Sequence, residues 1–399
     1  MKITSIDIYD LLPQSGNRGI APICIRINTD EGISGFGEVG TGYGNAHFAG
    51  VNIVRDLGTR IIGKNPLDIE AIWEDLFRNT FWGMAGGTVI YAGISAIDIA
   101  LWDIKGKVFQ APVYQLLGGK CQERIRTYAS QVQFGWGPVK LYLDDPADYA
   151  QAVRDAAAQG YTAVKVDPIG VTDQGVWIRA SRDDTWKLRG IMPSKVLDRA
   201  CARVEAMRAA GGKDLDIIIE NHAFTDSNTA IQLAKALEPY DIYYMEEAVH
   251  PLNSDSMKFI RENVSIPLAA GERIFTRWGY RPFLEDHSLQ VLQPDFCLVG
   301  GITEGKKVAD LANLYDCTIQ GHCCGGPIST AAALQVEAAI PNFIIHELHS
   351  GALKEQIRSL CKYDYMPENG YYRVPELPGI GQELSEEAMS RADHIEVRG

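Results

Sequence analysis

The chain has 399 residues, of which 46% are hydrophobic and 22% charged, a composition that excludes wholesale disorder, collagen and a small disulfide scaffold. Its formal net charge is −13 and it contains no basic run, so we expect no nucleic-acid partner, because such partners require positive charge along the phosphates. No apolar run approaches the ~18 residues of a membrane span, so we expect no membrane partner. The first residues do not resemble a secretory signal, and the eight cysteines form no C-x-x-C pair. We therefore expect a cytoplasmic protein.

The first part of the chain predicts strands followed by helices. Residues 3–9 and 23–27 alternate between apolar and polar side chains, and a turn at 30–32 follows the second run. Residues 46–118 carry helical patterns, among them 94–102, whose apolar residues recur at helical spacing. Strands that precede helices in this way favour an α+β domain.

After residue 119 the pattern changes to short apolar runs that alternate with helical stretches. The runs predict strands at 124–129, 163–166, 217–219, 243–245, 268–270, 291–293, 318–320 and 343–345. The helices are expected at 145–159, 195–211, 226–238, 254–264, 277–285, 303–314 and 328–339. Such alternation favours a parallel (β/α)₈ barrel of the α/β class. An open doubly wound sheet is the rival, but no glycine-rich nucleotide turn follows the first strand. The stretch 169–194 is long for a βα loop and is a candidate lid.

Polar side chains follow the carboxyl ends of six predicted barrel strands. They are Glu220, Glu246, Glu272, Asp295, His322 and Glu347, separated by 26, 26, 23, 27 and 25 residues. Each step is about one βα unit, so these groups are expected to converge on the barrel mouth, where active sites of this fold lie. Three converging glutamates require a cation, and all-oxygen ligation favours Mg²⁺, or Mn²⁺, over zinc. The alternative is that each glutamate caps a helix or pairs with an arginine at the rim.

Three further sets of residues suggest acid–base and binding roles. Lys165 and Asp167 end the second predicted barrel strand on the same side, where they could hold an anionic substrate or pair with each other. His222 lies two residues after Glu220 and could act as an acid or base. His322 follows Asp295 by one βα unit, and such a carboxylate would orient the imidazole and strengthen it as a base.

These motifs resemble the enolase superfamily, specifically its mandelate racemase and muconate lactonizing enzyme family, and within it the galactonate dehydratase-like acid-sugar dehydratases. The similarity lies in segments 29–38, 96–107, 114–119, 271–273, 292–295, 300–304, 327–329 and 377–381. The resemblance implies an N-terminal α+β capping domain at 1–119, completed by 360–399. It also implies a modified TIM (β/α)₈-type barrel at 120–359 that carries the active site.

The resemblance also implies roles for the residues at the barrel mouth. Glu220, Glu246 and Glu272 correspond to the metal ligands. His322 and Asp295 correspond to the catalytic dyad, and Glu347 to the acidic group of the last strand. The first ligand is usually Asp rather than Glu, and the usual K-x-K reads Lys-Val-Asp at 165–167, which argues against a racemase with two lysine bases.

The implied reaction is loss of water from a sugar acid bound through its carboxylate to Mg²⁺ and Lys165. His322 would remove the proton α to the carboxylate, a protonated Glu347 would stabilise the enediolate, and His222 would protonate the leaving β-hydroxyl. The product would be a 2-keto-3-deoxy acid. An epimerase or cycloisomerase that shares the enediolate is one alternative, and a non-catalytic metabolite-binding protein is another.

The sequence does not specify which sugar acid the protein takes. Substrate contacts are predicted for Lys165 and Asp167 in the barrel and for Asn17, Arg18 and Trp82 in loops of the capping domain. The aldonic acids of the galactonate, gluconate and mannonate type are the expected substrates. By resemblance the protein is expected to form a homo-oligomer, either a dimer or an octamer.

Overall fold

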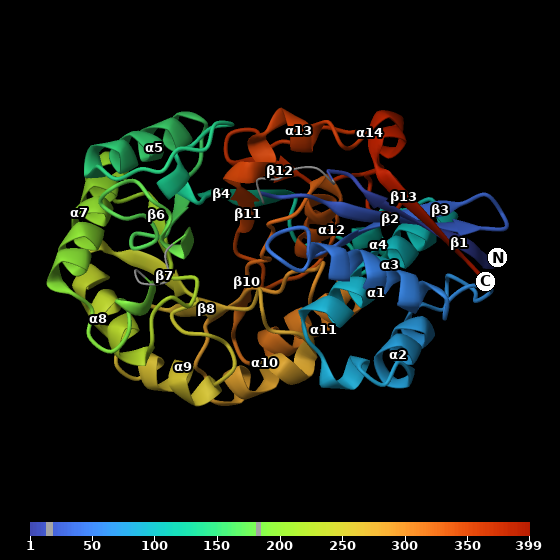
Figure 1. The fold of residues 1–399 in the computed structure, drawn as a ribbon, viewed down its shortest axis with the longest axis horizontal. Coiled ribbons are helices and arrows are strands. Elements are labelled where there is room, and N and C mark those ends of the chain that lie inside the picture. Colours follow the sequence, from blue (N-terminus) through green and yellow to red (C-terminus); the bar gives the residue numbers. More distant parts are fainter. Residues whose placement is uncertain (13–18, 181–184) are drawn as a thin grey trace.

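The computed structural model describes residues 1–12, 19–180 and 185–399, and it places both ends of the chain in one antiparallel sheet. The sheet order is β13-β1-β2-β3, so the last strand pairs with the first. The strands are β1 (Ile3–Asp10), β2 (Ile23–Thr29), β3 (Ser34–Val39) and β13 (Asp393–Arg398). Figure 1 shows the two termini together at the edge of the molecule farthest from the barrel.

Helices α1 (His47–Gly58) and α3 (Thr88–Val108) pack on this sheet, and the helices α2 (Ile69–Asn79) and α4 (Val113–Leu116) pack against α3. The buried helix α3 lies directly on β3, because β3 carries glycines at the contact. A Cβ atom on Gly35 would lie 2.2 Å from the Ala100 carbonyl oxygen, and one on Gly37 would lie 2.0 Å from that of Ala96. Larger residues would therefore push the helix off the sheet.

A curled parallel sheet forms the second part of the molecule. Its order is β10-β9-β8-β7-β6-β5-β4-β11, with β12 (Tyr371–Arg373) antiparallel to β4. The parallel strands are β4 (Arg124–Ser130), β5 (Ala163–Val166), β6 (Asp216–Glu220), β7 (Ile242–Glu246), β8 (Leu268–Ala270), β9 (Val291–Leu292), β10 (Thr318–Ile319) and β11 (His346–His349). The predicted capped barrel of the TIM type is thereby confirmed.

The last barrel strand begins later than predicted. The expected strand at 343–345 is wrong, because continuous pairing with β4 starts at His346. Residues 343–345 are apolar and largely buried, which is why they resemble a strand, but they contribute a single bridge between Phe343 and Ile319 of β10. Residues 343–345 therefore pair with β10 through this bridge, and the chain then continues directly into β11.

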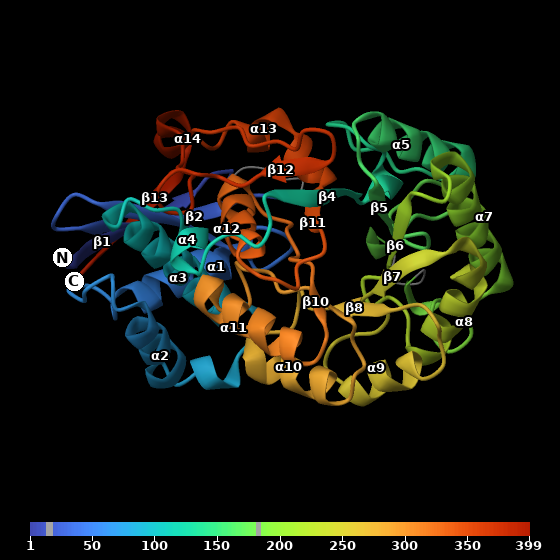
Figure 2. The ribbon, with the colours of Figure 1, turned by 180° about the vertical axis from the view of Figure 1, so that it is seen from behind.

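Helices surround the curled sheet (Figures 1 and 2). They are α5 (Pro146–Ala158), α7 (Ser194–Gly211), α8 (Ser227–Leu237), α9 (Ser254–Arg261), α10 (Thr276–Glu285), α11 (Gly301–Leu314) and α12 (Pro327–Ala338). Side-chain caps start several of them; Asp226, for example, forms a reciprocal capping box with Thr229. In the part of the chain that the structure describes, no helix is long and apolar enough to cross a membrane.

Buried carboxylates of the N-terminal domain bind helix N-termini of the barrel. The Glu38 carboxylate on β3 accepts hydrogen bonds from the backbone N–H groups of Gly326 and Ser329 at the start of α12, at 2.5 and 2.9 Å. Asp98 on α3 accepts one from Thr303 in the first turn of α11, at 2.9 Å. The partial positive charge of a helix N-terminus favours such anions. These contacts hold the N-terminal domain against the barrel; the boundaries at 119 and 360 stay a prediction.

Candidate active site

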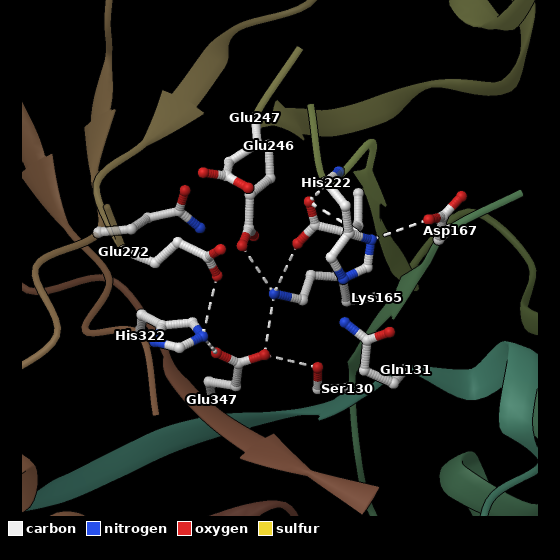
Figure 3. Close-up of polar contacts among 12 residues, drawn as sticks. Ser130, Gln131, Lys165, Asp167, His222, Glu246, Glu247, Glu272, His322 and Glu347 are labelled. Carbon is white, nitrogen blue, oxygen red and sulfur yellow. Dashed lines mark hydrogen bonds and ion pairs between the residues drawn. The ribbon is translucent and has the colours of Figure 1, made fainter. Parts of the chain in front are cut away.

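The predicted polar residues lie together at the carboxyl ends of the barrel strands; Figure 3 labels four of them, Glu246, Glu272, His322 and Glu347. Glu220 and Glu246 are the last residues of β6 and β7 and are aligned in register. Glu272, Asp295 and His322 follow β8, β9 and β10, and Glu347 lies in β11. Because parallel strands end at the same edge of a barrel, the spacing of about one βα unit translates into spatial convergence.

Lys165 lies at the centre of this cluster. Its Nζ atom is 2.8 Å from Glu246 Oε1, 2.8 Å from Glu347 Oε1 and 3.3 Å from Glu220 Oε2. The side chain is fully buried. Burial opposes its charge, but the surrounding carboxylates, Glu246 foremost, hold the pKa of Lys165 well above its ordinary value. These contacts favour the charged ammonium, and Lys165 pairs with these glutamates rather than with Asp167.

The glutamates predicted as metal ligands do not surround a common point. Among the described residues, no group of three or more His, Cys, Asp or Glu side chains is arranged to hold a metal ion. Lys165 lies against Glu220 and Glu246, while Glu272 is turned toward His322, 3.0 Å from its Nε2 atom. The ammonium and the imidazole thus supply the positive charge that the three carboxylates need.

The donor set nevertheless suits a hard divalent cation. Burial raises the pKa of Glu220 to about 7 and that of Glu246 well above its ordinary value, because Lys165 offsets the cost of burying these carboxylates only in part. The Oε2 atom of Glu246 is buried and has no hydrogen-bond partner. An uncompensated carboxylate oxygen beside two more carboxylates is the chemistry that Mg²⁺ prefers.

His322 is held on both ring nitrogens by carboxylates. Its Nδ1 atom lies 2.7 Å from Asp295 Oδ2 and its Nε2 atom 3.0 Å from Glu272 Oε2. Burial disfavours the imidazolium, but Glu272 and Asp295 together raise the pKa of His322 well above its ordinary value. The Asp–His pairing expected from the spacing is therefore present in the geometry.

A second Asp–His pair lies on the other side of Lys165 in Figure 3. The Nδ1 atom of His222 is 2.8 Å from Asp167 Oδ2, and its backbone N–H donates to Glu220 Oε1 at 2.7 Å. His222 adopts a left-handed backbone conformation with φ of 48°, which turns its ring toward the cavity that it lines. Asp167 is fully buried. The sequence placed Asp167 beside Lys165, and only the fold reveals that it orients His222.

The surroundings of Glu347 favour its ionised form, whereas from the sequence we expect it to be protonated; its protonation in the enzyme stays a prediction. It accepts hydrogen bonds from Ser130 Oγ at 2.6 Å and from the Cys323 backbone N–H at 3.1 Å. Burial would raise its pKa, but Lys165 and His322 lower the pKa of Glu347 to about 2. The expectation considered the neighbouring carboxylates and overlooked the cations that lie closer to this one.

These groups line a cavity of about 270 Å³ between the barrel mouth and the N-terminal domain. The N-terminal domain contributes a loop that includes Thr41 and Tyr43, together with Thr88 at the start of α3. From the 169–194 stretch, Trp177 and Arg179 line the cavity. Residues 181–184 of that stretch lie outside the described part of the chain, and its role as a lid stays a prediction.

Of the remaining predicted substrate contacts, only Trp82 belongs to the described part of the chain. Trp82 is 67% exposed and is not among the residues that line the cavity. Asn17 and Arg18 lie outside the described residues. The sequence reasoning missed Gln131, which directly follows β4, although the strand-end rule used for the glutamates would have found it. It also missed Arg273, whose guanidinium holds the buried Glu247 through two hydrogen bonds of 2.8 and 2.5 Å.

Comparison with known proteins identifies the same family over both parts of the chain. Residues 148–388 match the family model for the enolase C-terminal domain-like fold. Residues 18–118 match the model for the mandelate racemase and muconate lactonizing enzyme N-terminal domain.

Several relatives align over most of their length. A D-galactonate dehydratase from Ralstonia nicotianae is 34% identical over 97% of this chain and 93% of its own. A D-xylonate dehydratase from Haloferax volcanii is 33% identical over 92% of this chain and 84% of its own. Among solved structures, a member of the enolase superfamily from Salmonella Typhimurium is 53% identical, with a TM-score of 0.95 and full coverage of both chains.

Proposed function

The chain belongs to the mandelate racemase and muconate lactonizing enzyme family of the enolase superfamily, and from this premise we propose that it is a Mg²⁺-dependent dehydratase of a sugar acid. The observation that carries the proposal is the presence of two imidazoles, His322 and His222, each held by its own aspartate on either side of Lys165. Elimination of water needs a base at the α carbon and an acid at the β-hydroxyl. The relatives named D-galactonate and D-xylonate dehydratase support a sugar-acid substrate.

Glu220, Glu246 and Glu272 would hold Mg²⁺, which when bound supplies positive charge against the substrate carboxylate. Lys165 adds a fixed positive charge beside them. Because Asp295 occupies Nδ1 of His322, Nε2 is the nitrogen that would act as the base and remove the proton α to the carboxylate, once Glu272 leaves the imidazole to hold Mg²⁺. Glu347 stays anionic, holds Lys165 in place and lies 4.0 Å from His322 Nε2, where it favours the imidazolium that forms.

His222 completes the elimination. Asp167 holds its Nδ1 atom, so Nε2 delivers the proton to the departing β-hydroxide. The resulting enol tautomerises to a 2-keto-3-deoxy acid. We propose aldonic acids of the galactonate, gluconate or mannonate type as substrates. The cytoplasmic location and the homo-oligomer, dimer or octamer, stay predictions.

The test is to incubate the protein with Mg²⁺ and a library of C5 and C6 aldonic and aldaric acids and to assay 2-keto acids. We expect one or a few stereochemically related acids to be converted. A parallel incubation in D₂O reports exchange of the α proton. Exchange or inversion without a 2-keto acid would overturn dehydration in favour of an epimerase or cycloisomerase. Neither product nor exchange, with ligand binding intact, would indicate a binding protein.

A further inference from the structure

A second cavity of about 540 Å³ adjoins the one that contains the predicted catalytic groups. We call it the vestibule; it lies between the loop at 134–142 and the segment at 349–356, next to residues 19–20. The two cavities share four lining residues, Tyr43, Phe134, Trp177 and His349. At about 270 Å³ the inner cavity is at the small end of ligand sites, which range from about 300 to 1,000 Å³. A ligand longer than the inner cavity would therefore reach into the vestibule.

The two cavities differ in charge. Carboxylates line the inner cavity, namely Glu220, Glu272, Asp295 and Glu347. Two of its cations, Lys165 and Arg273, are paired with glutamates. The described lining of the vestibule contains no aspartate or glutamate, and it contains two lysines, Lys140 and Lys354. In a protein with a net charge of −13, a positive cavity beside an acidic one marks a place for an anion.

Lys140 is held in place without a counter-charge. Its Nζ atom lies over the ring of Phe134, 4.0 Å from the centroid, and 5.1 Å from that of Tyr142. Burial lowers its pKa. Within the described part of the chain neither Lys140 nor the half-buried Lys354 forms an ion pair. Both ammonium groups thus keep their hydrogen-bonding capacity for a ligand.

His349 supplies a donor at the junction between the two cavities. The backbone N–H of Gly351 donates to its Nδ1 atom at 2.9 Å, so the neutral ring carries its proton on Nε2. Burial lowers the pKa of His349 to about 4, which keeps the ring neutral near pH 7. The Nε2–H of His349 can donate a hydrogen bond at the junction, and Lys140 and Lys354 lie beyond it in the vestibule. This order of groups suits a polyhydroxy ligand whose far end carries a negative charge.

We propose that the vestibule is the subsite for the far end of the substrate, and that Lys140 and Lys354 bind a second anionic group there. The preferred substrates are then sugar acids with an acidic group at both ends, either a terminal carboxylate or a phosphate monoester. Plain aldonates fill the inner cavity alone. This inference rests on the proposed function, because it assumes that the first carboxylate binds at the barrel mouth.

The test measures binding by calorimetry, with Mg²⁺ present, for three ligands of matched configuration: D-galactonate, galactarate and D-galactonate 6-phosphate. A charged group that gains hydrogen bonds from an ammonium is expected to bind about tenfold more tightly than the neutral hydroxyl. The Lys140→Met/Lys354→Met double variant should lose this preference. Lys140→Arg and Lys354→Arg should keep it, which separates charge from shape. Lys258→Met, exposed on α9 and lining neither cavity, is the matched control.

Tighter binding of galactarate alone would assign a carboxylate subsite, and tighter binding of the phosphate alone a phosphate subsite. Equal binding of all three ligands, or a preference that persists in the double variant, would overturn the inference. The same ligands are assayed in parallel for 2-keto acid. If none is dehydrated but the preference for the second anion holds, the proposed dehydration fails while the subsite stands. If D-galactonate is dehydrated without any preference, the subsite fails alone.

Discussion

The barrel mouth and the joint between the two domains both bury carboxylates, but they stabilise them in different ways. At the joint, Glu38 and Asp98 accept hydrogen bonds from backbone N–H groups of helix N-termini, and burial still raises the pKa of each to about 7. At the mouth, Lys165 and His322 lower the pKa of Glu347 to about 2 against the effect of burial. Partial charges thus offset desolvation incompletely at the joint, and full charges reverse it at Glu347, although not at Glu220 and Glu246, which share Lys165.

This difference separates structure from chemistry. At the joint, backbone N–H groups bind the buried carboxylates Glu38 and Asp98, while an ion pair between Lys307 and Glu70 lies at the surface. At the mouth, buried ions of both signs lie in direct contact. Four experiments test the contrast, from the largest expected effect to the smallest.

Replacing Lys165 with Met is expected to have the largest effect, because it leaves Glu220, Glu246 and Glu347 without their shared cation. Breaking a buried ion pair costs about 3–5 kcal/mol of unfolding free energy, and we expect no measurable turnover. Urea unfolding measures the cost. Lys107→Met is the control, since Lys107 is less buried and pairs with Asp103 near the joint. Equal losses for the two variants would contradict the distinction.

Replacing His322 with Asn should abolish dehydration while leaving the fold intact. Loss of a general base typically lowers the rate by 10²–10⁴-fold, or about 3–5 kcal/mol of barrier. The loss is measured as the rate of 2-keto acid formation from the sugar acid that wild type converts fastest. Calorimetry should show that Mg²⁺ still binds. His250→Asn, an exposed histidine outside the cavity, is the control and should behave as wild type. Full activity of His322→Asn would remove the Asp295–His322 pair from the mechanism.

Replacing His222 with Asn should block elimination but allow exchange of the α proton, because His322 remains. We expect 2-keto acid formation to fall by about 10²–10⁴-fold, with deuterium still entering at the α carbon in D₂O, as followed by NMR. Asp167→Asn should reproduce part of this loss, since Asp167 orients the ring. If exchange disappears together with elimination, His222 has another role.

Replacing Asp98 with Asn should change the pH dependence of stability. Because burial raises the pKa of Asp98 from 3.8 to about 7, the folded protein binds this proton more tightly than the unfolded chain. The contribution to stability is therefore present below pH 4 and is lost as the pH rises to 7, by a few kcal/mol at about 1.4 kcal/mol per pKa unit. Denaturant unfolding at pH 4 to 8 should show a flatter profile for Asp98→Asn than for wild type.

Asp75 on α2 offers a control of opposite sign. Burial opposes the effect, but Lys64 and Arg60 lower the pKa of Asp75, so its contribution is present at neutral pH and is lost in acid. The side chain is partly exposed, and the effect of Asp75→Asn should be below about 1 kcal/mol.

Parallel profiles for wild type and Asp98→Asn would mean that the Asp98 carboxylate is ionised in the folded protein.

The sequence by itself determined the elements and the edge where the polar groups meet. Hydrophobic periodicity is a local property, so it predicted strands such as β5 and helices such as α12 within a residue or two. The recurrence of polar residues after successive strands predicted that Glu220, Glu246 and His322 would share one mouth. The prediction of a strand from the hydrophobic pattern failed at 343–345. There a buried apolar run makes a single bridge, and continuous pairing begins three residues later.

Only the tertiary structure decided which charges pair. Lys165 and Asp167 lie two residues apart in the sequence, yet Lys165 binds glutamates of three other strands and Asp167 binds His222. Ion pairing depends on distances of 3–4 Å across strands, and spacing along the chain specifies the strand end but not the direction of each side chain. For the same reason the pairing of Glu347 with Lys165 and the two lysines of the vestibule became visible only once the chain was folded.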